Sequence, residues 1–261
     1  MTFSPLTTLV HHRDLLSAWT MRIVRARYQQ SILGGLWAIL QPAAMVVIFT
    51  TIFSYLIRVD TKGVPYVIFS YTALVPWLLF STSISDMVES IVSNMNLVAK
   101  IYFPREIVVI SALLARLLDF IIAFSMLIVL MLYYHMPVFT TNWLILPLIL
   151  LVQLALTLGL GLAGAALNVF YRDIRHLVTL ILQLWLYATP IIYPVSVVPE
   201  RFRQLYFLNP MAGAIEAYRA VIIHNNLPDS SLVLSAAIGI ISLILGYWFF
   251  KKVEYKFADV I

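Results

Sequence analysis

Residues 9–42 read LVHHRDLLSAWTMRIVRARYQQSILGGLWAILQP, and this stretch joins a basic amphipathic helix directly to an apolar segment. Apolar side chains recur at three- and four-residue steps at Leu16, Trp19, Ile23 and Ala26, whereas polar and basic side chains occupy the opposite face. Such a helix is expected to lie in the headgroup layer of a membrane. A cleaved signal peptide is excluded, because several arginines precede the apolar run and no small-residue cleavage pattern follows it.

The composition is that of a protein that crosses a membrane several times. Of the 261 residues, 62% are hydrophobic and 11% are charged, and the mean hydropathy is +0.95. Soluble domains are about 45–50% apolar and about 25% charged. Because about 20 apolar residues cross a bilayer core of about 30 Å, the sequence predicts an all-α membrane protein with six spans, at residues 36–57, 64–85, 107–134, 143–170, 177–193 and 232–250.

The basic residues predict the orientation of these spans. With a cytoplasmic N-terminus, 11 of the 17 lysines and arginines fall on the cytoplasmic side and five on the other, with Arg116 inside a span. This positive-inside excess accounts for a pI near 9.4 without a nucleic-acid partner. We expect a single domain over residues 1–261, with an interfacial helix at 1–35, spans within 36–250, a tail at 251–261 and both termini cytoplasmic.

Several enzyme and metal-site patterns are absent from the sequence. No glycine–lysine pair occurs, so the phosphate-binding loop G-x-x-x-x-G-K-[ST] is missing, and a separate polypeptide would have to bind any ATP that drives this protein. There is no cysteine and no G-x-S-x-G elbow. We therefore expect no catalytic residue, no cofactor and no metal site in this chain, and no metal-ligand spacing links His11, His12, His135, His176 and His224.

Residues 94–106, NMNLVAKIYFPRE, connect the second and third predicted spans on the cytoplasmic side. Tyr102 and Phe103 stand just before Pro104, a residue that favours a helix start. Exposed aromatic and arginine side chains make good anchors at protein interfaces. The segment is interpreted either as a loop that dips into the membrane interface or as a knob that docks into a partner protein.

Arg116 and Asp119 are charged residues inside the third predicted span. Their spacing places them on one helix face, where they can pair. Since an ion at membrane depth costs at least about 2.5–3.5 kcal/mol, both side chains should face protein or water. A structural ion pair is the favoured interpretation, and a proton or ion relay is the alternative.

The fifth apolar segment is broken by Pro190, Pro194 and Pro199. Proline removes a helix hydrogen bond and clashes with the preceding turn, and irregular backbone at membrane depth is tolerated only where protein or water satisfies it. The helix expected after Pro210 is too polar to span. We therefore predict a re-entrant extracytoplasmic hairpin over residues 193–224.

Aromatic residues make up 13% of the chain, and most tryptophans lie near predicted span ends, as expected for a membrane-interface belt. Aromatic faces also suit the apolar C–H surfaces of sugar rings. Trp185 and Tyr187, beside the broken segment, are the best candidates for that second role.

Five stretches together carry a resemblance to a known family: LGGLWAILQP at 33–42, KIYFPRE at 100–106, NVFYRDI at 168–174, TPIIYP at 189–194 and NPM at 209–211. In this order they resemble the membrane subunit of an ABC-2 type exporter. The similarity is to the polysaccharide-export permeases, which move O-antigen, teichoic acid or related lipid-linked glycans. It covers nearly the whole chain.

The resemblance implies a homodimer of six-span subunits in the bacterial inner membrane, bound to two copies of a separate ATPase subunit that carries ATP and Mg²⁺. The chain would then be a transport subunit and not an enzyme, and the hairpin after the fifth span would form gate helices. Residues 94–106 would be a coupling helix that meets the ATPase through Asn96, Lys100, Tyr102, Phe103, Pro104, Arg105 and Glu106.

The leading hypothesis is therefore export of a lipid-linked polysaccharide. The phosphate headgroup would meet the interfacial helix at Trp19, Arg22, Arg25 and Arg27, although attraction to anionic membrane lipids explains these arginines equally well. The glycan would follow an aromatic route that includes Trp37, Trp185, Tyr187 and Tyr193.

The sequence is also compatible with three other functions. An ABC-2 drug or small-lipid exporter would share the fold. A membrane-embedded glycosyl- or acyltransferase would need a catalytic base, for which Asp86, Glu89 and Asp173 are the candidates. A transporter driven by an ion gradient would depend on Asp119.

Overall fold

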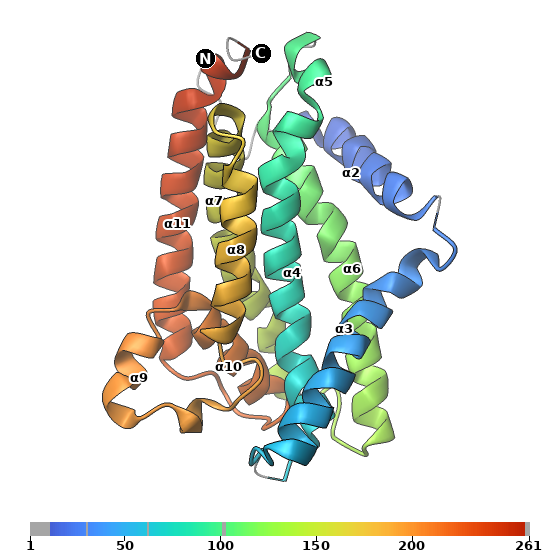
Figure 1. Ribbon diagram of the computed structural model, residues 1–261, viewed down its shortest axis with the longest axis vertical. Coiled ribbons are helices and arrows are strands. Elements are labelled where there is room, and N and C mark those ends of the chain that lie inside the picture. The colour runs from blue at the N-terminus through green and yellow to red at the C-terminus, as the bar shows by residue number, and fades with distance from the viewer. Residues whose placement is uncertain (1–10, 30, 62, 101–102, 259–261) are drawn as a thin grey trace.

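The protein is a bundle of helices. A computed structural model describes residues 11–29, 31–61, 63–100 and 103–258, and every regular element within these ranges is helical (Figure 1). Five helical stretches are long and apolar enough to cross a membrane, which confirms the predicted all-α membrane architecture. They are Gly34–Leu56, Tyr66–Ser93, Glu106–Tyr133, Thr141–Phe170 and Ser231–Phe257.

The fifth predicted span corresponds to a shorter helix. α8 (Ile174–Tyr187) has 14 residues, which at 1.5 Å per residue gives a length of about 21 Å, less than the bilayer core of about 30 Å. A non-helical stretch with the 3-10 turn η4 (Val195–Val197) follows it. The described residues thus contain five helices of spanning length and the shorter α8, and the count of six spans stays a prediction.

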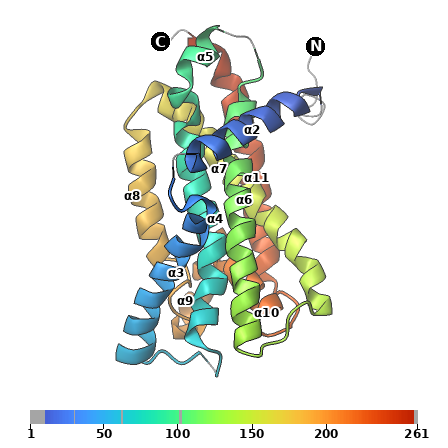
Figure 2. The ribbon, with the colours of Figure 1, turned by 90° about the vertical axis from the view of Figure 1, so that its right-hand side faces the viewer.

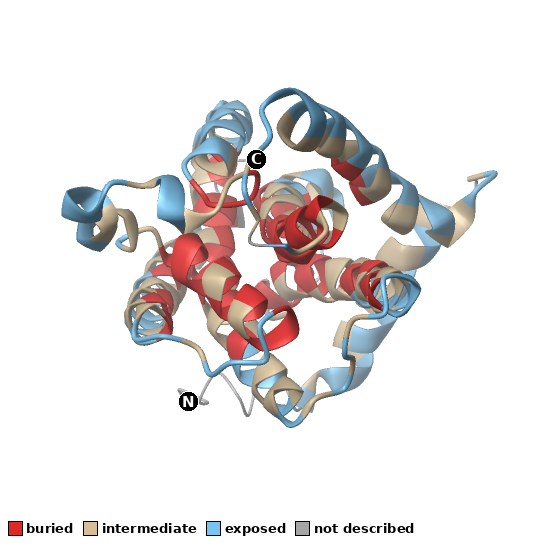
Figure 3. Ribbon diagram, turned by 90° about the horizontal axis from the view of Figure 1, so that it is seen from below, coloured by how far each residue is buried: buried red, intermediate tan, exposed pale blue. Residues whose placement is uncertain are grey.

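α4 (Tyr66–Ser93) is the central helix of the bundle. In its most apolar window 78% of the residues are buried, against 11% in Gly34–Leu56 and 17% in Ser231–Phe257. α6 (Glu106–Tyr133) and α7 (Leu146–Phe170) pack on it. Viewed along the bundle, buried ribbon gathers near the middle and exposed ribbon at the rim (Figure 3).

α4 continues beyond the predicted span end at residue 85 and reaches Ser93. The apolar run stops at Asp86, but the helix continues past it. The charge of Asp86 is compensated by Arg116 on α6. The extension brings Asp86 and Glu89 into the helix.

α7 and α11 (Ser231–Val253) are packed so closely that their backbones touch. A Cβ atom built on Gly159 or Gly246 would overlap backbone atoms of the opposite helix. Close approach through small residues is a common way for membrane helices to associate, since lipid offers little hydrophobic drive between them. Glycine is required here for space and not for backbone conformation.

α2 (Arg13–Tyr28) lies across the outside of the bundle, against α6 (Figure 2). The chain then turns sharply at η1 (Gly34–Leu36), where Gly34 has a φ of +50°, a conformation that favours glycine. The first span follows as α3 (Trp37–Phe49) and the π-helical η2 (Thr50–Leu56). The predicted interfacial helix thus appears as α2, and residues 1–10 of that prediction lie outside the described residues.

The two ends of the bundle carry different elements. α5 (Met95–Lys100) and the C-terminal end of α11 lie at one end, near α2. α9 (Glu200–Tyr206) and α10 (Pro210–Ile222), which belong to the predicted hairpin, lie at the other end (Figure 1).

Candidate functional site

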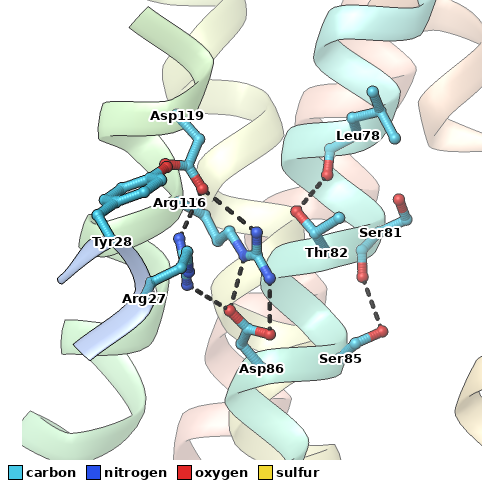
Figure 4. A network of polar contacts seen from close by, with 9 residues as sticks. All are labelled: Arg27, Tyr28, Leu78, Ser81, Thr82, Ser85, Asp86, Arg116 and Asp119. Atoms are coloured by element: carbon cyan, nitrogen blue, oxygen red, sulfur yellow. Dashed lines mark hydrogen bonds and ion pairs between the residues drawn. The ribbon is translucent and has the colours of Figure 1, made fainter. Parts of the chain in front are cut away.

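Four charged side chains from three helices form one ion network beneath α2 (Figure 4). Arg27 of α2 donates from Nη1 to Asp119 at 2.6 Å and from Nη2 to Asp86 at 2.9 Å. Arg116 of α6 donates to both oxygens of Asp86, at 2.6 and 3.0 Å, and to Asp119 at 3.2 Å. Tyr28 also donates to Asp119. Each guanidinium group therefore bridges two carboxylates.

The ion network is neutral and partly shielded from solvent. It combines two guanidinium and two carboxylate groups, whose side chains are 15–29% exposed. Forked guanidinium–carboxylate bonds are among the stronger hydrogen bonds, and they compensate ions that would otherwise be costly at membrane depth. Burial and the hydrogen bond to Asp119 raise the pKa of Tyr28, so its phenol keeps the proton that it donates. The network fastens α2 to α4 and α6.

The structure brings together more residues than the sequence predicted. Arg116 and Asp119 lie within hydrogen-bond distance, as their spacing suggests. The contacts between Arg116 and Asp86 are more numerous and shorter. The sequence pattern indicates Asp86 only as a possible catalytic base and Arg27 only as a headgroup ligand. The signal for their pairing is a carboxylate at the end of one apolar run together with an arginine inside another span.

The other arginines of α2 face outwards. Arg22 and Arg25 are exposed and line a shallow surface pocket with Gln29, and Arg22 lies 5.2 Å from the ring centre of Trp19. The terminal nitrogens of Arg27, by contrast, are engaged by carboxylates. An anionic headgroup would therefore find Arg22 and Arg25 accessible.

Trp19 also connects α2 to the segment that precedes α6. Its ring packs on Phe103 with a centroid distance of 5.5 Å. Arg105 donates to the backbone oxygen of Glu254, and its guanidinium lies 5.6 Å from the ring centre of Phe257. The predicted coupling segment is thus held to α2 on one side and to the C-terminal turn η5 (Glu254–Ala258) on the other.

The C-terminal end of α11 is fixed to the start of α6. Glu106 is 2% exposed and accepts a hydrogen bond from Nζ of Lys251 at 2.8 Å. Nearby, Phe257 is fully buried against Phe170 and Phe250, with centroid distances of 5.9 and 5.6 Å. The last turn of the described chain therefore closes this end of the bundle.

The predicted coupling residues differ in accessibility. Asn96 and Lys100 on α5 are exposed, whereas Phe103, Pro104 and Arg105 are half-buried and Glu106 is buried. Tyr102 lies outside the described residues. Among those described, Asn96 and Lys100 are the ones that a docked partner could reach without rearrangement.

Asn209 joins the end of α8 to the start of α10. Its Oδ1 accepts from the indole N–H of Trp185 at 2.8 Å and from the backbone N–H of Met211 at 3.1 Å. Its Nδ2 donates to the carbonyl oxygen of Ala188 at 3.1 Å and to the hydroxyl of Thr189 at 3.0 Å. This uses the two donors and two acceptor positions of an asparagine side chain.

The predicted glycan-pathway aromatics lie in different environments. Trp185 is half-buried edge-to-face on Phe80 at 5.2 Å and holds Asn209, whereas Tyr187 is 67% exposed. Tyr193 is half-buried and donates to the backbone oxygen of Tyr187 at 2.9 Å. Trp37, on α3, is 54% exposed. The structure does not bring Trp37 into contact with the other three among its described ring contacts.

Arg219 ties the hairpin to the central helix. It is 2% exposed, pairs with Glu216 at 2.9 Å and donates to the carbonyl oxygen of Ile191 at 3.0 Å. Its guanidinium lies 3.6 Å from the ring centre of Phe69 on α4. At the same end, burial and a hydrogen bond with Tyr193 raise the pKa of Tyr206, so its phenol stays neutral.

Replacing Trp185 by phenylalanine is expected to lower the free energy of unfolding by about 0.5–1.5 kcal/mol, because a ring remains on Phe80 while the hydrogen bond to Asn209 is lost. Thermal unfolding of the purified protein in detergent measures the change. Trp248→Phe is the matched control, since Trp248 is 57% exposed on α11 and has no hydrogen-bond partner among the described residues. Equal losses in the two variants would contradict the role given to Asn209.

Metal ligands are not clustered in the described part of the chain, where no group of three or more His, Asp or Glu side chains could hold an ion. Of the possible catalytic bases, Asp86 is engaged by two arginines, while Glu89 and Asp173 are exposed. Nothing in these positions forms a facing acid–base pair.

Residues 14–223 match the family model described as ABC-2 type transporter. The chain is 33% identical over 257 residues to the O-antigen export system permease protein RfbA of Myxococcus xanthus, with 97% of both chains covered. It is 31% identical over 249 residues to a protein of the same name from Klebsiella pneumoniae, with 95% of both covered. The polysialic acid transport protein KpsM of Escherichia coli is 25% identical over 92% of this chain and 93% of its own.

Proposed function

The chain belongs to the ABC-2 type transporter family, and we propose that it is the permease subunit of an ATP-driven exporter for a lipid-linked polysaccharide. It is a transport component and not an enzyme. The names of its relatives, which export O-antigen or transport polysialic acid, support a glycan as the cargo. An O-antigen-like polymer is the first candidate, and teichoic acid is a related one.

The observation that carries this proposal is the assembly of α2, α5 and the C-terminal turn at one end of the bundle. Trp19 and Arg105 join the residues that follow α5 to α2 and to the C-terminal turn. Arg27 continues the linkage from α2 into α4 and α6. A partner that moves α5 or α2 would therefore act directly on two spanning helices. The hairpin with α9 and α10 lies at the opposite end, where an exit gate would be needed.

The partner would be an ATPase that supplies the energy. Because the chain has no glycine–lysine pair, ATP and Mg²⁺ would be bound by that separate subunit. We propose a homodimer of this chain with two ATPase copies, since a closed two-fold assembly uses each interface twice. Exposed apolar side chains on α8, among them Leu177, Leu180 and Leu184, are consistent with contact to lipid or a second copy.

The proposed topology has six crossings and both termini in the cytoplasm of a bacterial inner membrane. α8 and the irregular residues 188–199 together would make the sixth crossing, with backbone satisfied by contacts such as those of Asn209 and Arg219. The basic residues at the α5 end favour this orientation. The lipid phosphate would meet Arg22 and Arg25, and the glycan would pass Tyr187 and Tyr193.

The proposal is tested by deleting the coding sequence and measuring surface polysaccharide, together with the ATPase rate of the reconstituted complex. We expect surface glycan to be lost and nucleotide hydrolysis to depend on co-assembly of both subunits. Normal surface glycan combined with sensitivity to toxic compounds would instead indicate a drug exporter. Glycan synthesis that fails before export would indicate a transferase.

Lys100→Glu is expected to weaken ATPase binding by about tenfold, or ~1.4 kcal/mol. Lys100 is exposed on α5, where a reversed charge meets the partner surface directly. Pull-down titration with the purified ATPase subunit measures the change. Arg201→Glu makes the same charge reversal on the exposed α9 at the opposite end of the bundle and is the control. Equal weakening would mean that general charge, and not α5, governs docking.

A further inference from the structure

A cavity of about 170 Å³ lies beside the ion network, between α2, α3, α4 and α6. It is large enough to hold several water molecules. Its walls include Arg27 and Tyr28 from α2 and Trp37 from the start of α3. The cavity therefore sits where the interfacial helix turns into the first span.

The cavity has a polar end and an apolar end. On α4 the lining changes from Thr82 to Val75 with distance from α5, and on α6 it changes from Asp119 to Phe120 and Ala123. α4 runs towards α5, whereas α6 runs away from it (Figure 1). On both helices the lining therefore becomes more apolar with distance from α5. Thr82 and Val75 are separated along the helix by about 10 Å. Such a gradient fits an amphiphile whose polar part lies nearer α5.

The polar end offers both donors and acceptors without excess charge. Arg27 and Asp119 line it, and both belong to the neutral ion network. The side chains of Trp37 and Gln41 also line the cavity, and neither has a hydrogen-bond partner among the described residues. Thr82 uses its proton on a backbone oxygen and leaves its own oxygen free to accept. These groups can meet phosphate oxygens and an ammonium group at the same time.

We propose that this cavity binds a zwitterionic glycerophospholipid from the leaflet next to α5. Its headgroup would lie at Trp37, Gln41 and the ion network, and the first methylene groups of one acyl chain would enter between Val75 and Ala123. Indole rings favour the headgroup level of a bilayer, which suits Trp37, an exposed residue that also lines the cavity. An anionic diphosphate is a poorer fit, because both arginines at this cavity, Arg27 and Arg116, are already compensated by carboxylates.

The bound lipid would act as a wedge behind the turn at Gly34 and hold α3 away from α4 and α6. This role of the lipid does not depend on the transported substrate. The lipid proposal can therefore fail while the proposed export function stands. The proposal also predicts that the complex selects lipids by headgroup charge at this cavity, and not over the whole lipid-facing surface of the bundle.

The test uses the complex with its ATPase in vesicles that contain phosphatidylethanolamine with a photoreactive group near the top of the acyl chain. Peptide mapping is expected to find label on residues 37–42 and 116–123. Ala38→Leu, which fills the cavity, should reduce this label about tenfold. Ala44→Leu is the matched control, because it makes the same change on the exposed face of α3.

Competition with unlabelled lipids decides the chemistry. Phosphatidylethanolamine should compete well and phosphatidylglycerol poorly. The proposal is overturned if label is uniform around the bundle, if both alanine variants behave alike, or if the anionic lipid competes equally. Strong competition by a polyprenyl diphosphate would also overturn the proposal, because it would indicate that the cavity binds the transported substrate. If Ala38→Leu lowers thermal stability, Gln41→Leu takes its place in the test, because it removes the donor and acceptor of the amide from the cavity with little change in side-chain size.

Discussion

Replacing Arg116 by methionine is expected to destabilise the protein by about 2–4 kcal/mol and to abolish coupled transport. Breaking a buried ion pair costs about 3–5 kcal/mol, and the partial exposure of these groups, 15–29%, reduces that figure. Without Arg116, Asp86 and Asp119 would share Arg27 alone. Thermal unfolding in detergent and the ATPase rate of the reconstituted complex measure the two effects.

Charge exchange distinguishes this role from simple packing. The double variant Asp86→Arg with Arg116→Asp keeps the total charge and should recover part of the stability that either single reversal loses. Arg13→Met is the surface control, since Arg13 is 80% exposed and pairs only loosely with Asp14 at 3.8 Å. It should change stability by about 0–1 kcal/mol. A loss at Arg13 equal to that at Arg116 would refute the special role of the network.

Gly246→Ala is expected to cost about 3 kcal/mol or more, because the new methyl group would overlap the backbone oxygen of Gly159 and force α7 and α11 apart. Backbone atoms cannot move aside as a flexible side chain can. The measurable results are a large fall in melting temperature and low yield of folded protein from membranes.

Gly35→Ala provides the matched control for that variant. A Cβ atom at Gly35 would meet only Cδ1 of Ile122 at 3.7 Å, which is ordinary van der Waals contact. Its stability should therefore change little. If Gly35→Ala were as harmful as Gly246→Ala, loss of glycine itself, and not helix contact, would be the cause.

The spanning helices could be predicted because apolar runs are a local property of the sequence. Hydropathy alone could not place the end of α4, since it stops at Asp86, whose charge is compensated by Arg116 on a different helix. Nor could hydropathy place the end of α8, because the apolar run continues through Pro190 whereas the helix ends at Tyr187.

The ion network could be predicted only in part, because it also depends on contacts between different helices. The spacing of Arg116 and Asp119 on one helix face is visible in the sequence, whereas the arrival of Arg27 from α2 depends on how α2 lies across α6. In the predicted coupling segment, Glu106 accepts a hydrogen bond from Lys251, a residue far along the chain. Sequence patterns identify such segments as important but do not reveal which of their side chains remain free.

The order of the four network charges along the chain has a consequence for biosynthesis. Arg27 and Asp86 are made first and have opposite charges, and they pair at 2.9 Å in the final structure. Arg116 and Asp119 follow, three residues apart on one helix, and enter the membrane together as a second pair of opposite charge. Because α2 reaches the network by packing on α6, Asp86 gains its arginine partners only after α6 has been made. Arg116 and Asp119, by contrast, enter with a partner on their own helix, which lowers the cost of an ion at membrane depth. The complete network therefore forms only when α2, α4 and α6 are all in place.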